Sequence, residues 1–187
     1  MLAAAKSVRA WHEDPVPTYA RPGDNAGQPI DFDAQGWQVI PGPKGPVLQT
    51  PGFQSFAAIT VKAWVLSPPN RFAGEPCSPL QMTICSDELL AWMASFEAWL
   101  QPKFPGPEVW KSAVKRNAYS ETYLRVKFTD TVRFFNADGT LTPDLQMARG
   151  QTVYLMCSLS LYQVSGLRGV SIRALGVQAD SEPKPPA

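Results

Sequence analysis

Cations and aromatic rings alternate along one stretch of the chain. If residues 121–129 form a strand, every second side chain shares one face, and that face carries Tyr123, Arg125 and Lys127. The intervening residues are mostly apolar and would face a core. Lysine and arginine neutralise phosphates with release of counterions, and bases of any sequence stack on aromatic rings. The stretch therefore has the chemistry of a surface that binds single-stranded nucleic acid.

Two other predicted strands repeat this combination. Tyr154 and Tyr162 share a face with serines on one of them, and Lys62 and Trp64 share a face on the other. We expect Arg168 to lie in a glycine-flanked turn, where it would hold a nucleic-acid backbone. The candidate nucleic-acid-binding residues are Lys62, Trp64, Lys115, Arg116, Tyr123, Arg125, Lys127, Arg133, Phe134, Tyr154, Tyr162, Arg168 and Arg173.

The sequence lacks the motifs of catalysis and of metal binding. It has no phosphate-binding glycine loop, no GxSxG and no HExxH. The single histidine, His12, lies in a Pro/Gly-rich leader, so a serine or cysteine nucleophile has no base beside it. The cysteines Cys77, Cys85 and Cys157 are odd in number, and no two have CxxC spacing. We therefore expect no catalytic residue, no cofactor and no metal.

Positive charge is concentrated in one part of the chain. The formal net charge is only +1, yet residues 103–173 hold ten Lys and Arg against five Asp and Glu. No disulfide framework is indicated, which favours a reducing compartment, cytoplasmic or nuclear, in a host cell if the source is viral. The opening apolar run is too short for a signal peptide, and no run approaches the ~18 apolar residues of a membrane span.

Hydrophobic alternation predicts a mainly β, α+β domain. Asn136–Gly139 and Ser165–Gly169 have the composition of turns, and Pro68-Pro69 is expected to end the first long strand. The predicted strands are Phe56–Leu66, a short one at Leu80–Cys85, Thr122–Phe135, Gln151–Val164 and Val170–Gln178.

One amphipathic helix is predicted over Ser86–Leu100. Ser86 is a good N-cap, and apolar residues recur at i, i+3, i+4 and i+7. We expect its aromatic stripe to pack on a sheet or barrel rather than to bind a ligand, because amphipathic helices usually bury that face.

The flanking segments are rich in proline and glycine. Residues 1–52 are expected to be an arm with turns and one short strand at 36–40, parts of which pack on the core through Trp11, Trp37 and Phe53. The predicted domain covers residues 53–179, and residues 180–187 form a flexible tail.

Residues 123–178 present a fixed order of strands and turns. A basic strand leads to a Phe-Phe-Asn turn in RVKFTDTVRFFNADG, a glycine-led strand follows in GQTVYLMCSLSLYQVSG, and a closing strand follows in LRGVSIRALGVQ. In this order and spacing the chain resembles the phage and viral single-stranded DNA-binding proteins with an OB fold. The terminal DSEPKPPA departs from the acidic tail of many such proteins, and the resemblance does not cover the leader.

This resemblance implies an OB-like five-stranded barrel with one flanking helix. It also implies non-sequence-specific binding of single-stranded DNA in replication or recombination. The positions that match are Arg125, Lys127, Phe134, Phe135, Tyr154, Tyr162 and Arg168, and the two phenylalanines fit a core role equally well.

Two other classes of function stay open at this stage. A virion structural or adaptor protein would use the aromatic surface and Pro-rich arms for assembly contacts. An enzyme would need a pocket with converging polar groups. Nucleic-acid binding predicts that six side chains share one concave face, and scattering of these side chains favours the adaptor. The six are Lys62, Trp64, Tyr123, Arg125, Lys127 and Tyr162. The expected partners are single-stranded DNA or RNA, with replication or recombination proteins and a homo-oligomer left open, and no membrane.

Overall fold

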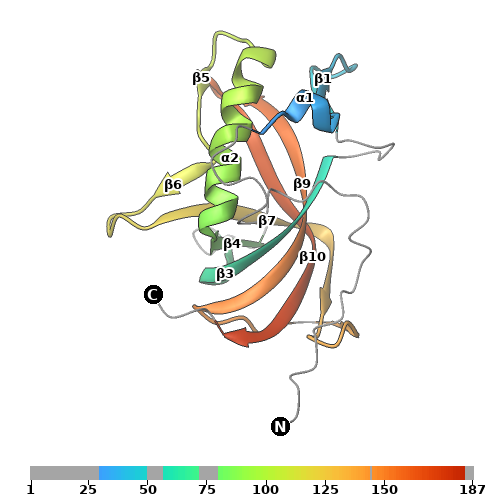
Figure 1. Ribbon diagram of the computed structural model, residues 1–187, viewed down its shortest axis with the longest axis vertical. Helices are drawn as coiled ribbons and strands as arrows, with labels where there is room; N and C mark the ends of the chain where they lie inside the picture. The colour runs from blue at the N-terminus through green and yellow to red at the C-terminus, as the bar shows by residue number, and fades with distance from the viewer. Residues whose placement is uncertain (1–29, 50–56, 72–79, 144, 184–187) are drawn as a thin grey trace.

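Five long strands form a closed barrel in the computed structural model, which describes residues 30–49, 57–71, 80–143 and 145–183 (Figure 1). Neighbours pair in the order β10-β9-β3-β4-β7, and a parallel pairing of β10 with β7 closes the ring. The barrel strands are β3 (Ala57–Arg71), β4 (Leu80–Cys85), β7 (Thr122–Phe135), β9 (Gln151–Val164) and β10 (Leu167–Pro183). The predicted mainly β, OB-like five-stranded barrel with one main helix is confirmed.

Alternation of apolar and polar residues builds the barrel wall. On β7, Leu124, Val126 and Phe128 are buried while Arg125 and Lys127 are exposed, as the period of two requires. The inward residues of β9 are buried in the same way. The bounds predicted for β4, β7 and β9 are confirmed.

Two local predictions are wrong. Strand β3 continues through Pro68 and Pro69, because its register with β4 shifts between Ser67 and Asn70 and the prolines fall in that irregularity, where no regular ladder bond is lost. The turn before β10 is also shorter than predicted.

That turn is only Ser165-Gly166, with φ of 53° and 76°. Positive φ at both central residues is typical of a type I′ hairpin turn, which glycine tolerates at no cost. Consequently β10 starts at Leu167, and Arg168 lies within a strand rather than in a turn.

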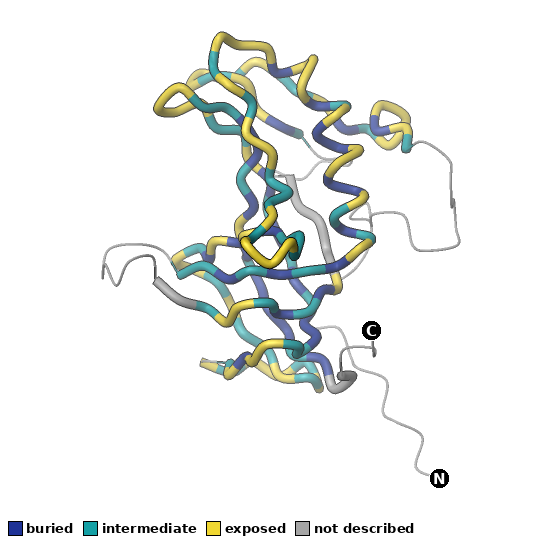
Figure 2. Tube along the Cα trace, turned by 90° about the vertical axis from the view of Figure 1, so that its left-hand side faces the viewer, coloured by how far each residue is buried: buried dark blue, intermediate teal, exposed yellow. Residues whose placement is uncertain are grey.

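The predicted helix is confirmed as α2 (Asp87–Leu100), which runs beside the barrel in Figure 1. Ser86 is its N-cap, and the Ser86 hydroxyl accepts a hydrogen bond from the Leu89 amide at 3.4 Å. A short 3₁₀ turn, η2 (Gln101–Lys103), ends it. Its buried stripe consists of Leu89, Trp92, Met93, Phe96 and Leu100, and Figure 2 shows this buried face along the helix.

The segment before the barrel packs on this helix. It contains α1 (Phe32–Gln35) and the antiparallel pair β1 (Gln38–Ile40) and β2 (Val47–Gln49). The Phe32 and Trp37 rings lie 5.4 and 5.0 Å from the Phe96 ring, centroid to centroid. The predicted packing of Trp37 and the short strand are therefore confirmed, and α1, capped by Asp31, is an addition. Trp11 and Phe53 lie outside the described residues.

Three short strands extend the sheet. β5 (Val109–Trp110) pairs in parallel with β10, β6 (Val114–Arg116) pairs antiparallel with β7, and β8 (Leu141–Thr142) also pairs with β7. The β6–β7 hairpin projects from the barrel wall in Figure 1. In the part of the chain that the structure describes, no helix has the length and apolarity to cross a membrane.

Candidate nucleic-acid interface

A cleft opens where the closing seam of the barrel begins. Strands β7 and β10 pair from Lys127 and Arg173 onward. Before that point β10 pairs with β5, and β7 pairs with β6 and β4, so the two strands separate. A cleft of about 450 Å³ lies here, lined from both sides.

The lining of this cleft is strongly basic. Its cations come from β7, from β10 and from the segment between β5 and the end of β6, and no carboxylate occurs among the described lining residues. We call these five side chains the cation set: Lys111, Lys115, Arg125, Lys127 and Arg173. Hydroxyls of Ser160, Tyr162 and Ser171 and apolar groups such as Leu161 and Val170 complete the wall.

The cations crowd one another. Burial lowers the pKa of Lys115 below its usual range, and the charges of Lys111 and Arg125 lower it further. Only Glu97 acts in the opposite direction on this lysine. Positive charges this close repel one another. An anion such as a phosphate would relieve this repulsion, so the cleft is suited to bind one.

Helix α2 positions one wall of the cleft through Glu97. The Glu97 side chain is buried, and its carboxylate accepts hydrogen bonds from the Ser112 hydroxyl at 2.6 Å and the Ala113 amide at 2.7 Å. The Lys111 amide donates to the Arg168 carbonyl at 2.9 Å. The segment that carries Lys111 and leads into β6 is therefore held at both ends.

The hydroxyl end of Tyr162 lies against a glycine in this wall. Tyr162 and Gly169 are paired across β9 and β10. A Cβ atom at Gly169 would come within 2.9 Å of the Tyr162 hydroxyl and 2.7 Å of the Lys111 carbonyl oxygen. Burial, followed by the charge of Glu97, raises the pKa of Tyr162. The absence of a side chain at Gly169 leaves room for the Tyr162 ring, which lines the cleft.

Tyr123 lies beside the cleft. It is half-buried and pairs with Lys115 across the β6–β7 hairpin, so the two side chains share a face. Along β7 the order Tyr123, Arg125, Lys127 then runs into the seam.

A second group of candidates lies elsewhere on the barrel. The Lys62 ammonium is 5.5 Å from the centre of the Tyr154 ring and 3.6 Å from the carboxylate of Asp180, whose side chain is 1% exposed. Trp64 is two residues along the same strand. Lys62, Trp64 and Tyr154 do not line the cleft. Of the six residues expected to share one concave face, Arg125, Lys127 and Tyr162 line the cleft, whereas Lys62, Trp64 and Tyr123 do not.

Four further candidates also lie outside the cleft lining. The Phe134 ring packs edge-to-face on Phe128 at 5.8 Å and against the core. Arg168, which is in β10 and not in a turn, places its guanidinium 5.3 Å from the Trp110 ring. Arg116 and Arg133 are exposed on β6 and β7.

Sequence reasoning missed Lys111, Ser171 and Glu97. The excess of Lys and Arg in residues 103–173 was the available signal for Lys111. Ser171 shares a row with Ser160 across β9 and β10, which strand pairing alone reveals. A buried glutamate in an amphipathic helix gives no signal in the sequence.

The described residues offer no cluster for a metal. No group of three or more His, Cys, Asp or Glu side chains comes together among them. Cys157 is a free thiol in the barrel interior, and burial raises its pKa to about 12. It is therefore protonated at neutral pH and a poor nucleophile.

Comparison with known proteins gives structural matches only. No protein-family model matches the chain, and no curated protein matches it. Among solved structures it is similar to gp2.5, a single-stranded DNA-binding protein of bacteriophage T7, with 12% identity and a TM-score of 0.44 over 72% of this chain and 96% of that one.

The chain is also similar to the single-stranded DNA-binding protein of bacteriophage Enc34. The C-terminally truncated form gives 12% identity and a TM-score of 0.49 over 78% of this chain and 97% of that one. The complex with single-stranded DNA gives 13% identity and a TM-score of 0.43, over 67% and 88%.

Proposed function

We propose that this chain is a non-sequence-specific single-stranded DNA-binding protein that acts in phage or viral DNA replication or recombination. The observation that carries the proposal is the basic cleft, with its cation set and the Tyr162 ring in one wall. The chain's own surface supports it independently of the likeness to solved structures.

The position of the cleft supports the same function. OB folds bind oligonucleotides on the face of their second and third strands and with the loops that join strands 1 to 2 and 4 to 5. In chain order β4 and β7 are the second and third barrel strands, and Ser165-Gly166 joins the fourth to the fifth. The cleft lies between β7 and the β9–β10 hairpin, which matches that location.

Each part of the cleft has a role in this proposal. The cation set neutralises phosphates, and bases stack on Tyr162 and Tyr123. Neither contact reads a base edge, so affinity depends little on sequence. The resemblance of residues 123–178 to phage and viral proteins supports DNA as the strand. We assign Lys62, Trp64 and Tyr154 to a secondary surface.

The domain limits follow from the same proposal. The binding domain runs from residue 53 to Pro183, the end of β10, four residues beyond the predicted limit of 179, so residues 180–183 are not part of a tail. The arm before the domain supports α2 through Phe32 and Trp37. The two cysteines among the described residues, Cys85 and Cys157, form no disulfide, which supports a reducing intracellular compartment.

A titration tests the function. The purified chain is titrated into a labelled oligothymidylate and into a duplex of equal length, each at two salt concentrations. We expect tighter binding to the single strand and an affinity that falls as salt rises. Equal affinity for the duplex, or no binding at low salt, contradicts the proposal and favours an adaptor role.

A further inference from the structure

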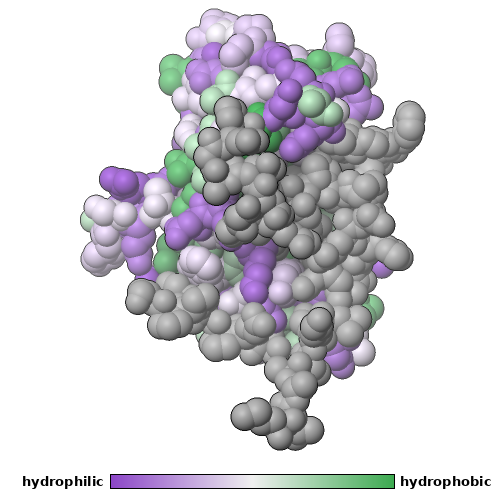
Figure 3. Space-filling model, in the orientation of Figure 1, coloured by the Kyte–Doolittle hydropathy of each residue, from purple (hydrophilic) through white to green (hydrophobic). Residues whose placement is uncertain are grey.

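The turn at the end of the β6–β7 hairpin presents an aromatic ring to solvent. Tyr119 is 86% exposed, whereas large apolar and aromatic side chains are normally at least partly covered. It lies between Arg116, the last residue of β6, and Thr122, the first of β7. Figure 3 shows a largely hydrophilic surface on this projecting hairpin.

The backbone around the ring is fixed. The Asn117 side-chain oxygen accepts hydrogen bonds from the Tyr119 amide at 2.9 Å and the Glu121 amide at 3.0 Å. The Asn117 side-chain NH₂ donates to the Glu121 carboxylate at 2.9 Å. Ser120 adopts a φ of 62°, a left-handed conformation that costs free energy unless its surroundings enforce it.

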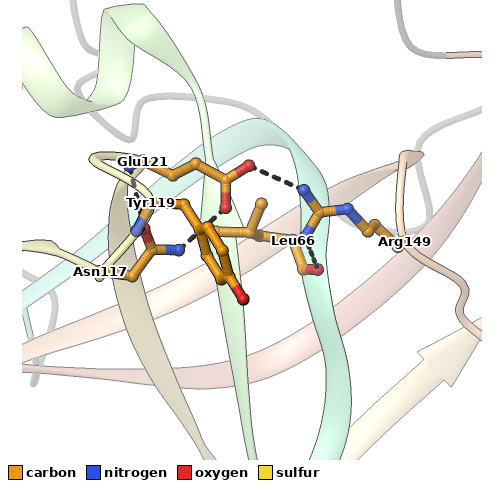
Figure 4. A network of polar contacts seen from close by, with 5 residues as sticks. All are labelled: Leu66, Asn117, Tyr119, Glu121 and Arg149. Atoms are coloured by element: carbon orange, nitrogen blue, oxygen red, sulfur yellow. Dashed lines mark hydrogen bonds and ion pairs between the residues drawn. The ribbon is translucent and has the colours of Figure 1, made fainter.

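The turn is also tied to the barrel. Arg149 donates to the Glu121 carboxylate at 2.8 Å and to the Leu66 carbonyl on β3 at 3.2 Å (Figure 4). The Tyr119 ring takes part in none of the bonds drawn there. The Arg149 guanidinium compensates the negative charge of Glu121, the one carboxylate of the turn, and Asn117 donates a further hydrogen bond to it. Because the backbone that carries the ring is already fixed, only the torsions of the Tyr119 side chain remain to be ordered when a ligand stacks on it.

The hairpin leads from the cleft to this ring. Lys115 lines the cleft and pairs with Tyr123, and Arg116 follows it on the exposed surface. Tyr119 lies four positions after Lys115, at most about 14 Å of extended chain. If the phosphates of a nucleic-acid strand occupy the cleft, the neighbouring nucleotides of that strand can therefore reach the tip of the hairpin.

We propose that Tyr119 is a base-stacking contact that extends the binding path beyond the cleft. A base of a single strand is the favoured occupant because Tyr119 is the one exposed large apolar side chain that the described residues place on this hairpin, three positions after the exposed Arg116. A protein-docking surface has a contiguous apolar patch instead. This inference rests on the proposed function.

The test is a length series. Oligothymidylates of about 4 to about 16 nucleotides, the site sizes of OB folds, are titrated against the parent, Tyr119→Ala and Tyr119→Phe. We expect Tyr119→Ala to bind the shortest oligomers like the parent and the longest about 5- to 150-fold more weakly, with Tyr119→Phe like the parent throughout. The salt dependence should not change, because no charge is removed.

Three results overturn the inference while leaving the proposed function intact. They are parent-like binding by Tyr119→Ala at every length, an equal loss at every length, and a loss in Tyr119→Phe as large as in Tyr119→Ala. The first would point to a protein contact at the tip. Failure of the parent chain to bind any oligomer is instead the failure of the proposed function.

A second variant tests the fixed turn. Asn117→Ala keeps the Tyr119 ring and removes the side chain that fixes the turn. We expect a smaller loss with the same length dependence, because the ring must then be ordered on binding. Parent-like binding of the long oligomers by Asn117→Ala contradicts the role given to the turn.

Discussion

Gly169 is the residue whose substitution should disturb the cleft without changing its charge. In Gly169→Ala the new Cβ would lie 2.7 Å from the Lys111 carbonyl oxygen and 2.9 Å from the Tyr162 hydroxyl. The tyrosine can rotate away, but the carbonyl is backbone that the Lys111–Arg168 hydrogen bond holds. Both the ring and the wall that bears Lys111 must therefore move.

Two magnitudes follow from this displacement. Overpacking of this kind costs about 1–3 kcal/mol of unfolding free energy. Loss of one stacking platform costs about 1–3 kcal/mol of binding free energy, which is the expected effect of Tyr162→Ala. If Gly169→Ala acts mainly through the ring, its effect and that of Tyr162→Ala should not add in the double variant.

The assay is a fluorescence titration with an oligothymidylate, with denaturant unfolding as the stability control. Gly45→Ala is the matched control, since a side chain at Gly45 meets open space but its φ of 113° is strained. We expect Gly45→Ala to lower stability and leave affinity unchanged. Parent-like affinity of Tyr162→Ala would refute the role given to the Tyr162 ring. Additive effects of the two substitutions would mean that Gly169→Ala acts mainly through the wall that bears Lys111.

Three further predictions concern single side chains. Arg125→Ala should weaken binding to all sequences alike and lower the salt slope by about one unit, whereas Tyr123→Ala should cost about 1–3 kcal/mol with the slope unchanged; parent-like titrations of both would make this face ordinary surface. Glu97→Gln should lower the unfolding free energy by about 1.5–3 kcal/mol in denaturant titration, because a charged acceptor of two short hydrogen bonds is lost. Burial raises the pKa of Cys157 from 9.0 to about 12, so the contribution of this thiol to the unfolding free energy is complete below pH 9.0 and is lost as pH rises toward 12. The decrease in unfolding free energy measured between pH 9.0 and 12 should be smaller in Cys157→Ala than in the parent. An equal decrease in both contradicts the assigned role of the buried thiol.

Strand and helix positions were predictable because their patterns are local. β7 alternates apolar and charged side chains from Leu124 to Phe128, and α2 has both a capping serine and a helical stripe. The extension of β3 past Pro68 was not predictable, because prolines are tolerated there only through a register irregularity with β4. Likewise Ser165-Gly166 suffices as a turn because both residues adopt positive φ.

The cleft itself could be predicted only in part. Strand alternation predicts on which face of its strand each of Arg125, Lys127 and Tyr162 lies. Their meeting depends on the parallel pairing of β7 with β10, a contact between distant segments that no local pattern encodes. The same holds for Lys111, which the β5–β10 pairing brings to the cleft, and for Glu97, which reaches it from α2.

The most direct test of the central claim is a map of the binding surface by NMR. Backbone amide shifts of the labelled chain are recorded with and without a saturating oligothymidylate. The account predicts that the largest changes cluster around Lys115, Arg125, Lys127 and Arg173. Changes centred on Lys62 and its neighbours, with the cleft amides unmoved, would contradict it.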